Sequence, residues 1–305
     1  MFYKYFKKLV LIIATIFVLG CISKGWHFVS RGFATHKILP PQDCRCRCSE
    51  MPKDMPKEFF SIFDQEYSFL DKGCQVYVFE GQDKQHVIKF LRHHKYKPPF
   101  WITFLFFKLD TKLYKRNLSD YKKSRVMNAF NSYLMSYEEL KKETAMVYVH
   151  LGTTKHLNKI LTVRDKLGQK RYLDLDKSHF LVQKKVYRLA PILLELDQTG
   201  EVDRAKLLID GYFQVVKNRI EKGIKNVDHS GYIRNMGVVD NRVVEMDVGG
   251  YRKNKDLQTK EGIKREYDRF YVHLKQWAEK RAPNLVEYID QSSKKVLKDV
   301  DVVDV

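Results

Sequence analysis

A chain of 305 residues is long enough to bury a sizeable core, either as one large two-lobed domain or as two ordinary domains. Hydrophobic residues make up 44% of it and charged residues 30%, a balance that excludes a disordered chain. The 56 Lys and Arg outnumber the 37 Asp and Glu, so the net charge is +19 and favours anionic partners such as nucleotides or an anionic membrane surface. No nucleic-acid recognition motif accompanies this charge, and we do not expect nucleic acid to be a partner.

The N-terminal segment combines lysines with an apolar run. Three lysines precede the run Leu9 to Ile22, which at about 14 residues is short for a spanning helix unless the residues around Trp26 extend it. A basic stretch followed by a short apolar run resembles a secretory signal, and VLGC resembles a lipoprotein processing box with Cys21 as the lipidated residue. We predict that residues 1–30 attach the protein to a membrane, as an anchor or as a lipoprotein-like signal, on a side that the flanking charges leave open.

Residues 31–57 are interpreted as a linker, because they contain four Pro and show no apolar periodicity. Cys44, Cys46 and Cys48 alternate with arginines there, and a disulfide between next-but-one residues would be strained. The three thiols are therefore expected either to stay free or to serve metal binding or lipidation. The folded domain is expected to begin near Glu58.

Three strands are predicted at the start of this domain. They cover Tyr67 to Leu70, Gln75 to Glu80 and His86 to Leu91, and the sequence GQDKQ forms the turn before the third strand. Gly73 lies between the first two strands. Lys89 stands in the third strand among apolar neighbours, which is unusual because strand lysines mostly face solvent.

The middle of the chain is predicted to mix helices and strands. The aromatic segment 97–117 is either a buried helix or a second contact with the membrane surface. Ser124 to Leu151 is predicted to be a helix that carries Glu139 and Glu143, with Glu143 closer to its apolar stripe. Further strands are expected in HLNKILTV, KRYLDL and SHFLVQKKVYRL, and helices at about 200–224, 261–280 and 284–297.

The stretch Asn226 to Asn254 concentrates carboxylates and amides around two short apolar runs. The runs flank Asp240–Asn241, which predicts a tight β-hairpin with its turn at that dipeptide. Asn235 precedes the hairpin and Asp247 follows it, so the hairpin would bring both to one end. The hairpin would thus place an amide and a carboxylate side by side at the end opposite its turn.

This order of elements resembles the protein-kinase-like superfamily, nearest its compact bacterial phosphotransferases, over roughly residues 58–277. VIKF resembles the VAIK strand of that family, and MDVGG resembles its DFG segment. The resemblance implies an α+β, two-lobed kinase-like domain over residues 58–300. Its small β-rich N-lobe would cover about residues 58–185 and its mainly helical C-lobe about residues 186–300, after the N-terminal hydrophobic segment.

The resemblance also implies a nucleotide site. Lys89 would hold the phosphates of ATP, with Glu143, or less favourably Glu139, as its carboxylate partner. Gly73 would occupy one position of the Gly-rich loop, although GCQVYV contains a single Gly where the family has several.

The implied metal ligands are Asn235 and Asp247. The family motif D-x-x-x-x-N places its catalytic Asp where this chain has Ser230, and Asp228 lies two residues further upstream. Either the loop carries a two-residue insertion and Asp228 is the base, or the base is absent. His229 is the other side chain in this loop that could serve as the base, although a single His beside an Asp is more often structural.

Three functions remain in competition. The first is a membrane-attached kinase that binds Mg-ATP and transfers phosphate to a protein or small-molecule acceptor. The second is a catalytically impaired pseudokinase, which acts as a binding or scaffold module at a membrane and is favoured by Ser230 and the missing glycines. The third is a basic peripheral membrane or nucleic-acid binder without a nucleotide site, whose binding would depend steeply on salt.

Overall fold

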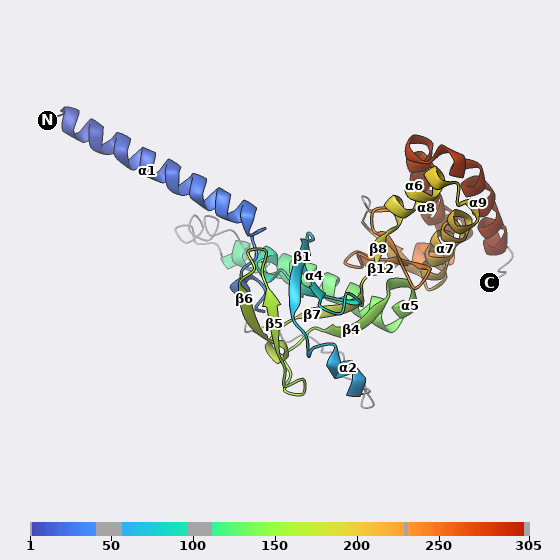
Figure 1. Ribbon diagram of the computed structural model, residues 1–305, viewed down its shortest axis with the longest axis horizontal. Helices are drawn as coiled ribbons and strands as arrows, with labels where there is room; N and C mark the ends of the chain where they lie inside the picture. The colour runs from blue at the N-terminus through green and yellow to red at the C-terminus, as the bar shows by residue number, and fades with distance from the viewer. Residues whose placement is uncertain (1, 41–56, 97–111, 229–230, 302–305) are drawn as a thin grey trace. The chain divides into compact units, whose positions relative to one another are not determined.

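The computed structural model in Figure 1 is a mixed α/β protein with one sheet of seven strands, a helical C-terminal part and a long N-terminal helix. It describes residues 2–40, 57–96, 112–228 and 231–301. The secondary structure confirms the expected combination of a β-rich part with a helical C-terminal part. Two compact units are present: Met1–Lys95 with Gly152–His179 form the first, and Tyr96–Leu151 with Phe180–Val305 form the second.

The seven strands follow the order β4-β7-β3-β2-β1-β5-β6 across the sheet. Pairing is antiparallel for β1–β2, β2–β3, β4–β7 and β5–β6, whereas β1 and β5 run parallel. The three strands predicted first are present. The strand bounds are β1 (Tyr67–Lys72), β2 (Val76–Gly81), β3 (His86–Leu91), β4 (Met146–His150), β5 (Ile160–Arg164), β6 (Lys170–Asp174) and β7 (Phe180–Lys184).

The first unit is built around an aromatic cluster on β1 and β2. Tyr77 and Phe79 alternate with less buried neighbours along β2, as expected for a strand with one buried face. The ring of Phe33 lies 5.2 Å from that of Tyr77 and 5.1 Å from that of Phe79, and Phe69 lies 5.5 Å from Phe79. These edge-on contacts are favourable geometries for aromatic side chains.

Part of the segment predicted to be a linker packs into this unit. Phe33 and Ile38 are buried there, on either side of the short helix η1 (Thr35–Lys37). The Tyr77 hydroxyl donates a hydrogen bond of 2.6 Å to the carbonyl of Gly32. The chain is therefore fixed to the sheet as soon as the N-terminal helix ends. The three clustered cysteines lie outside the described residues.

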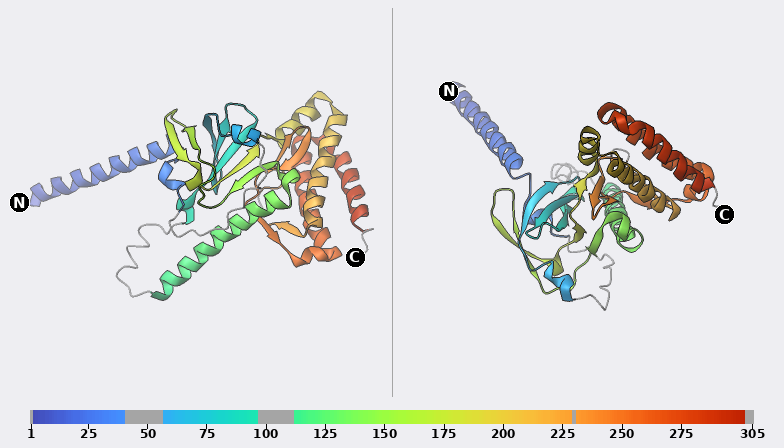
Figure 2. Two further views of the ribbon diagram at one scale, coloured as in Figure 1. Left: turned by 90° about the horizontal axis from the view of Figure 1, so that it is seen from below. Right: turned by 45° about the vertical axis from the view of Figure 1, so that its right-hand side comes forward.

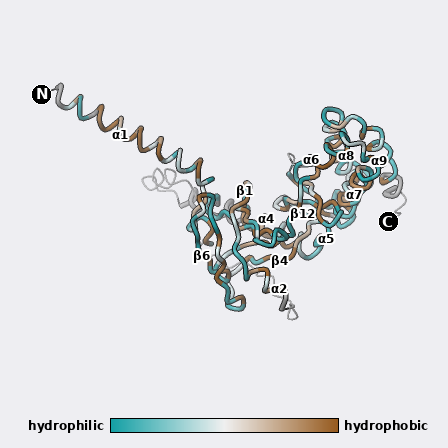
Figure 3. The backbone as a smooth tube through the Cα atoms, in the orientation of Figure 1, coloured by the Kyte–Doolittle hydropathy of each residue, from teal (hydrophilic) through white to brown (hydrophobic). Residues whose placement is uncertain are grey.

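The N-terminal helix α1 (Phe2–Val29) is longer than the apolar run that the sequence showed first. Its stretch Tyr5–Val29 covers 25 residues and is long and apolar enough to cross a membrane, a test that a signal sequence near an N-terminus also passes. Apolar residues follow one another along the middle of the helix in Figure 3, and its large side chains are exposed. A membrane anchor or a signal sequence has these features.

The second unit contains most of the helices, which Figure 2 shows from two further sides. Buried apolar residues of α6 to α9 form its core, where Tyr212 and Phe213 of one helix pack against Tyr267 and Phe270 of another. The helix bounds are α4 (Lys112–Glu138), α5 (Lys141–Thr144), α6 (Leu189–Thr199), α7 (Val202–Glu221), α8 (Lys260–Arg281) and α9 (Val286–Asp301).

One prediction of secondary structure was wrong in this unit, and one helix was not predicted. The helix expected from Ser124 to Leu151 ends at Glu138, and Ala145 adopts a left-handed φ of 51° before β4 begins. The sequence MVYVH of β4 is rich in β-branched and aromatic residues, and burial in the sheet decides its conformation. Helix α6 was not predicted. It ends at Thr199, and the φ of 75° at the following residue, Gly200, is typical of a glycine that terminates a helix.

Replacing Phe33 by Ala should destabilise the protein by about 3–5 kcal/mol, because a buried aromatic ring is lost from the cluster and leaves a cavity. Chemical denaturation of the detergent-solubilised chain measures this change. Leu39→Ala is the control, because Leu39 is 47% exposed and should change stability by no more than about 0.5 kcal/mol. Equal, small effects of both substitutions would mean that residues 31–40 are a linker.

Candidate functional site

The predicted β-hairpin is present in the second unit. Strand β10 (Met236–Val239) pairs antiparallel with β11 (Arg242–Glu245). The turn residues Asp240 and Asn241 have φ angles of 49° and 57°. Two successive residues with positive φ match the right-handed twist of the flanking strands, and Asn and Asp tolerate this conformation. The dipeptide at the turn therefore sets the register of the hairpin.

The open end of the hairpin brings together the two residues predicted as metal ligands. The amide of Met246 donates a hydrogen bond of 2.7 Å to the carbonyl of Asn235. Asp247 is the next residue, and its side chain is exposed. Asn235 and Asp247 thus leave the two strands at the same end, as the sequence predicted.

Asp228 also reaches this place. The Nδ2 atom of Asn235 donates a hydrogen bond of 2.9 Å to Oδ2 of Asp228. The Asp228 amide in turn donates to Oδ1 of Asn226 at 3.0 Å, which folds the start of the loop into a turn. A Cβ atom at Gly231 would lie 1.9 Å from Nδ2 of Asn235, so only glycine allows this pairing.

The spacing between Asp228 and Asn235, two residues longer than the kinase motif, therefore does not separate their side chains. The proposal that the loop carries an insertion agrees with this contact. His229 and Ser230, the other residues considered for this loop, lie outside the described residues.

The segment after Asp247 turns back along the loop. The Gly249 amide donates to Oδ1 of Asp247 at 3.3 Å. Ser132 of α4 holds the segment, because its hydroxyl donates to the Val248 carbonyl and accepts a 2.6 Å hydrogen bond from the Tyr251 amide. Strand β12 (Tyr251–Lys253) then pairs with β9 (Ile224–Asn226), which leads into the Asp228 loop. The two loops that carry the candidate residues are thus joined by a short sheet.

Lys89 and Gly73 belong to the first unit. Lys89 is partly buried in β3, opposite Val78 of β2. The Gly73 amide donates to the Val76 carbonyl at 2.9 Å, and its own carbonyl accepts from Arg92 at 2.7 Å. Both backbone groups of Gly73 are therefore engaged within the turn.

The two glutamates considered as partners of Lys89 lie in the second unit. Glu143 belongs to the four-residue helix α5, not to a long helix, and its Oε1 accepts a 3.0 Å hydrogen bond from Asn218 of α7. Glu139 lies just after α4 and forms an ion pair with Lys253. Each carboxylate thus has a partner within its own unit.

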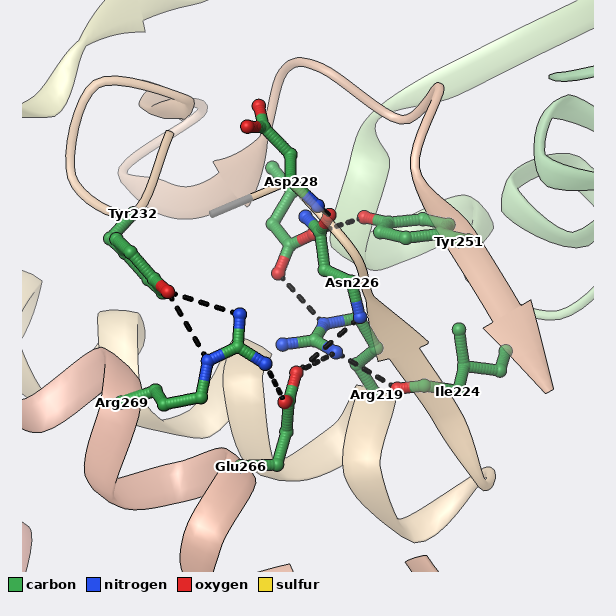
Figure 4. Close-up of polar contacts among 9 residues, drawn as sticks. Arg219, Ile224, Asn226, Asp228, Tyr232, Tyr251, Glu266 and Arg269 are labelled. Carbon is green, nitrogen blue, oxygen red and sulfur yellow. Dashed lines mark hydrogen bonds and ion pairs between the residues drawn. The ribbon is translucent and has the colours of Figure 1, made fainter. Parts of the chain in front are cut away.

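A buried ionic network supports the site from below (Figure 4). Arg219 of α7 is 1% exposed; its Nε lies 2.9 Å from Oε1 of Glu245 in β11 and its Nη1 lies 3.2 Å from Oε1 of Glu266 in α8. Nη1 also donates to the Ile224 carbonyl at 2.8 Å. The Tyr251 hydroxyl donates to the second oxygen of Glu245. One guanidinium therefore links α7 and α8 to strands β9 and β11.

The network continues into the Asp228 loop. Arg269 donates to Oε2 of Glu266 at 2.5 Å and to the Tyr232 hydroxyl at 3.0 Å and 3.2 Å. The ring of Tyr232 stacks on the ring of His273, which lies in α8 together with Arg269; the two ring centres are 3.9 Å apart. In Figure 4 the Asp228 carboxylate points away from Arg219, so the charges that hold the loop are separate from the carboxylate that it presents.

Burial and charge shift the ionisation of this network. Burial by itself would lower the pKa of Arg219, but the carboxylates of Glu245 and Glu266 outweigh it and raise that pKa. Burial, reinforced by Glu245, raises the pKa of Tyr251 well above its usual value. Arg219 is thus held charged and Tyr251 is held as a neutral donor.

The sequence prediction missed this network. The position of Arg219 in the sequence could have predicted its burial. It falls on the same helical face as three buried apolar residues, Val215, Val216 and Ile220. A basic residue on an apolar stripe predicts a buried partner. Nothing in the sequence pointed to Glu245 and Glu266 as those partners, since they lie on distant elements.

The hairpin end offers one carboxylate, of Asp247, and one amide oxygen, of Asn235, which are ligand types that Mg²⁺ accepts. Among the residues that the structure describes, no three or more His, Cys, Asp and Glu side chains form a group that could hold a metal ion. Mg²⁺ is usually bound through one or two carboxylates together with phosphate oxygens and water, so Asp247 and Asn235 would need a phosphate to complete the site.

Neither the family models nor the curated proteins searched contain a match to this chain. Function has therefore to be inferred from the chemistry of the residues themselves.

Replacing Arg219 by Met should destabilise the protein by about 3–5 kcal/mol, because Glu245 and Glu266 would remain buried without their counter-charge. The free energy of unfolding in urea measures the effect. Arg204→Met on the same helix is the matched control, since Arg204 is 58% exposed and 3.9 Å from Glu201, a pair that contributes at most about 1 kcal/mol. A loss below about 1 kcal/mol for Arg219→Met would show that the network does not hold the unit together.

Proposed function

We propose that the protein is a membrane-attached, protein-kinase-like phosphotransferase that binds Mg-ATP. The observation that supports it best is the open end of the hairpin, where Asn235 and Asp247 emerge together and Asp228 is bonded to Asn235. Carboxylate, amide and carboxylate at one place in the fold are the groups that phosphoryl transfer needs for metal binding and for the acceptor.

The proposed roles follow from the chemistry of each group. Asp247 and Asn235 bind Mg²⁺ through their side-chain oxygens, and the ion neutralises the phosphates. Asp228 faces the acceptor hydroxyl and takes its proton as the new O–P bond forms and the bond to ADP breaks. The hydrogen bond from Nδ2 of Asn235 orients the Asp228 carboxylate for this step.

Lys89 is proposed to bind the nucleotide phosphates, with Glu143, or less favourably Glu139, as its carboxylate partner. Its place on the third strand of the sheet agrees with that of the phosphate-binding lysine of protein kinases. Gly73 is proposed to contribute to the loop that covers the phosphates. The acceptor is a protein or a small molecule, and α1 attaches the enzyme to a membrane whose anionic surface attracts its positive charge.

Mg-ATP should raise the thermal stability of the detergent-solubilised chain, whereas ATP or Mg²⁺ alone should have smaller effects. At ~100 times its dissociation constant a ligand stabilises a protein by about 2.7 kcal/mol, which a thermal unfolding experiment detects readily. Asp247→Ala should abolish the metal-dependent part of this stabilisation. Gly231→Ala should weaken it as well, because the added Cβ displaces Asn235.

Asp240→Asn is the matched control for Asp247→Ala. Asp240 is an exposed carboxylate at the opposite end of the same hairpin, paired with Lys184 at 2.7 Å, and Asn tolerates its positive φ. This variant should keep the full response to Mg-ATP. An unchanged unfolding temperature of the wild-type chain with Mg-ATP would rule out the nucleotide site.

A pseudokinase is the second candidate, and one observation favours it. The Gly73 amide is engaged with Val76, so it does not offer its N–H to a phosphate in this conformation. A pseudokinase would bind nucleotide without turnover. Formation of ADP in the presence of Mg²⁺, measured for the wild type and for Asp228→Asn, separates the two candidates: an active kinase loses ADP formation in the variant but keeps Mg-ATP binding.

A further inference from the structure

Basic side chains gather around the C-terminal end of α1. An open pocket of about 580 Å³ lies there, within the size range of ligand sites. It is formed by the last turns of the helix, the residues that follow it and the end of β1. The residues that line it are Ser23, Lys24, His27, Phe28, Arg31 and Lys72.

The pocket is built on a fixed turn. Arg31 and Gly32 both adopt positive φ angles, 52° and 71°, which end α1 and direct the chain toward the sheet. A Cβ atom at Gly32 would lie 2.3 Å from the His27 ring, so the turn depends on glycine at this position. The Tyr77 hydroxyl and Nζ of Lys37 both donate to the Gly32 carbonyl, at 2.6 Å and 2.7 Å. Helix end and sheet are thereby held together.

Arg92 adds a further positive charge beside Lys72. Its Nη1 donates to the carbonyls of Gly73 and Cys74 at 2.7 Å and 3.3 Å, and its guanidinium lies 4.9 Å from the centre of the Tyr77 ring. Carbonyls and an aromatic ring position the guanidinium but carry no net negative charge. Arg92 is 6% exposed and does not line the pocket, so it adds positive charge from behind Lys72 without contacting an anion in the pocket.

The cations of this cluster repel one another. Burial, and after it the charges of Arg92, Arg31 and Lys95, lower the pKa of Lys72, while the Asp71 carboxylate acts in the opposite direction. Burial and then Arg92 and Lys72 lower the pKa of Lys37. An anion bound among these groups would relieve the repulsion.

We propose that this pocket binds the phosphate of an anionic phospholipid headgroup. The position of the pocket indicates that the bound phosphate belongs to a lipid. Helix α1 is exposed, apolar and long enough to cross a membrane, and the pocket lies at the end of that apolar stretch. The headgroup phosphates of the membrane leaflet that surrounds the C-terminal end of α1 lie at the depth of the pocket, and lysines near helix ends extend toward such phosphates. The first unit is thereby held against the membrane surface by a specific lipid as well as by its anchor. This inference does not depend on the Mg-ATP site.

The test uses the full chain purified in a non-ionic detergent, with bound lipids counted by native mass spectrometry. The chain is titrated with phosphatidylglycerol, and in parallel with phosphatidylcholine of the same acyl chains. One basic residue near a membrane surface changes the affinity for anionic lipid by about fivefold, so Lys24→Gln/Lys72→Gln should weaken phosphatidylglycerol binding by roughly 25-fold. Arg31→Gln/Lys72→Gln, which leaves α1 unchanged, should have a similar effect.

Lys155→Gln/Lys166→Gln is the matched control, because it removes two exposed lysines from the same unit at a different place. It should retain the affinity of the wild type. Equal losses in the control and the pocket variants, or equal binding of both lipids by the wild type, would overturn the proposal. Displacement of phosphatidylglycerol by millimolar inorganic phosphate would also overturn it, since the ligand would then be a soluble anion.

Discussion

The second unit depends on the burial of one charged side chain. Arg219 is almost fully excluded from water, and it is tolerable there because Glu245, Glu266 and a backbone carbonyl surround it. These partners come from a strand and a helix that are far from it along the chain. The charge can be satisfied in a single arrangement of these elements, so the pairing selects that arrangement while contributing little net stability of its own. That these ion pairs select one arrangement of the helices and strands is a hypothesis that agrees with the observed contacts.

The candidate site follows from that arrangement. Glu245 is the last residue of β11, two positions before Asp247, and Tyr232 lies within the Asp228 loop. The buried charges therefore fix both chain segments from the protein side. Asp247 is left exposed and Asp228 and Asn235 partly exposed, so that the proposed nucleotide and metal ion would reach them from solvent. Rigid support of a polar site from beneath is what a reaction that relies on positioning requires.

The local features of the site were predictable, because short-range rules govern them. The dipeptide Asp240–Asn241 predicts a tight hairpin, and the pairing of its strands places Asn235 and Asp247 at the same end. The contact of Asp228 with Asn235 was not predictable, since the path of the loop depends on the close approach allowed by Gly231. The surroundings of Glu143 were also not predicted. One helix was expected through Leu151, whereas Glu143 lies in the short helix α5 and the residues Met146–His150 form strand β4 of the sheet.

The sequence by itself determined the strands of the first unit, the amphipathic helices α7 to α9 of the second, the hairpin and the apolar N-terminal segment, since each rests on the spacing of residues close together in the chain. Tertiary structure decided the rest. It decided that Phe33 belongs to the core and not to a linker, that Arg219 meets two distant glutamates, and that the end of α1 is fixed to β1 and β2 in a basic pocket. These outcomes depend on contacts between residues far apart in the chain, and no local pattern of spacing or propensity specifies such contacts.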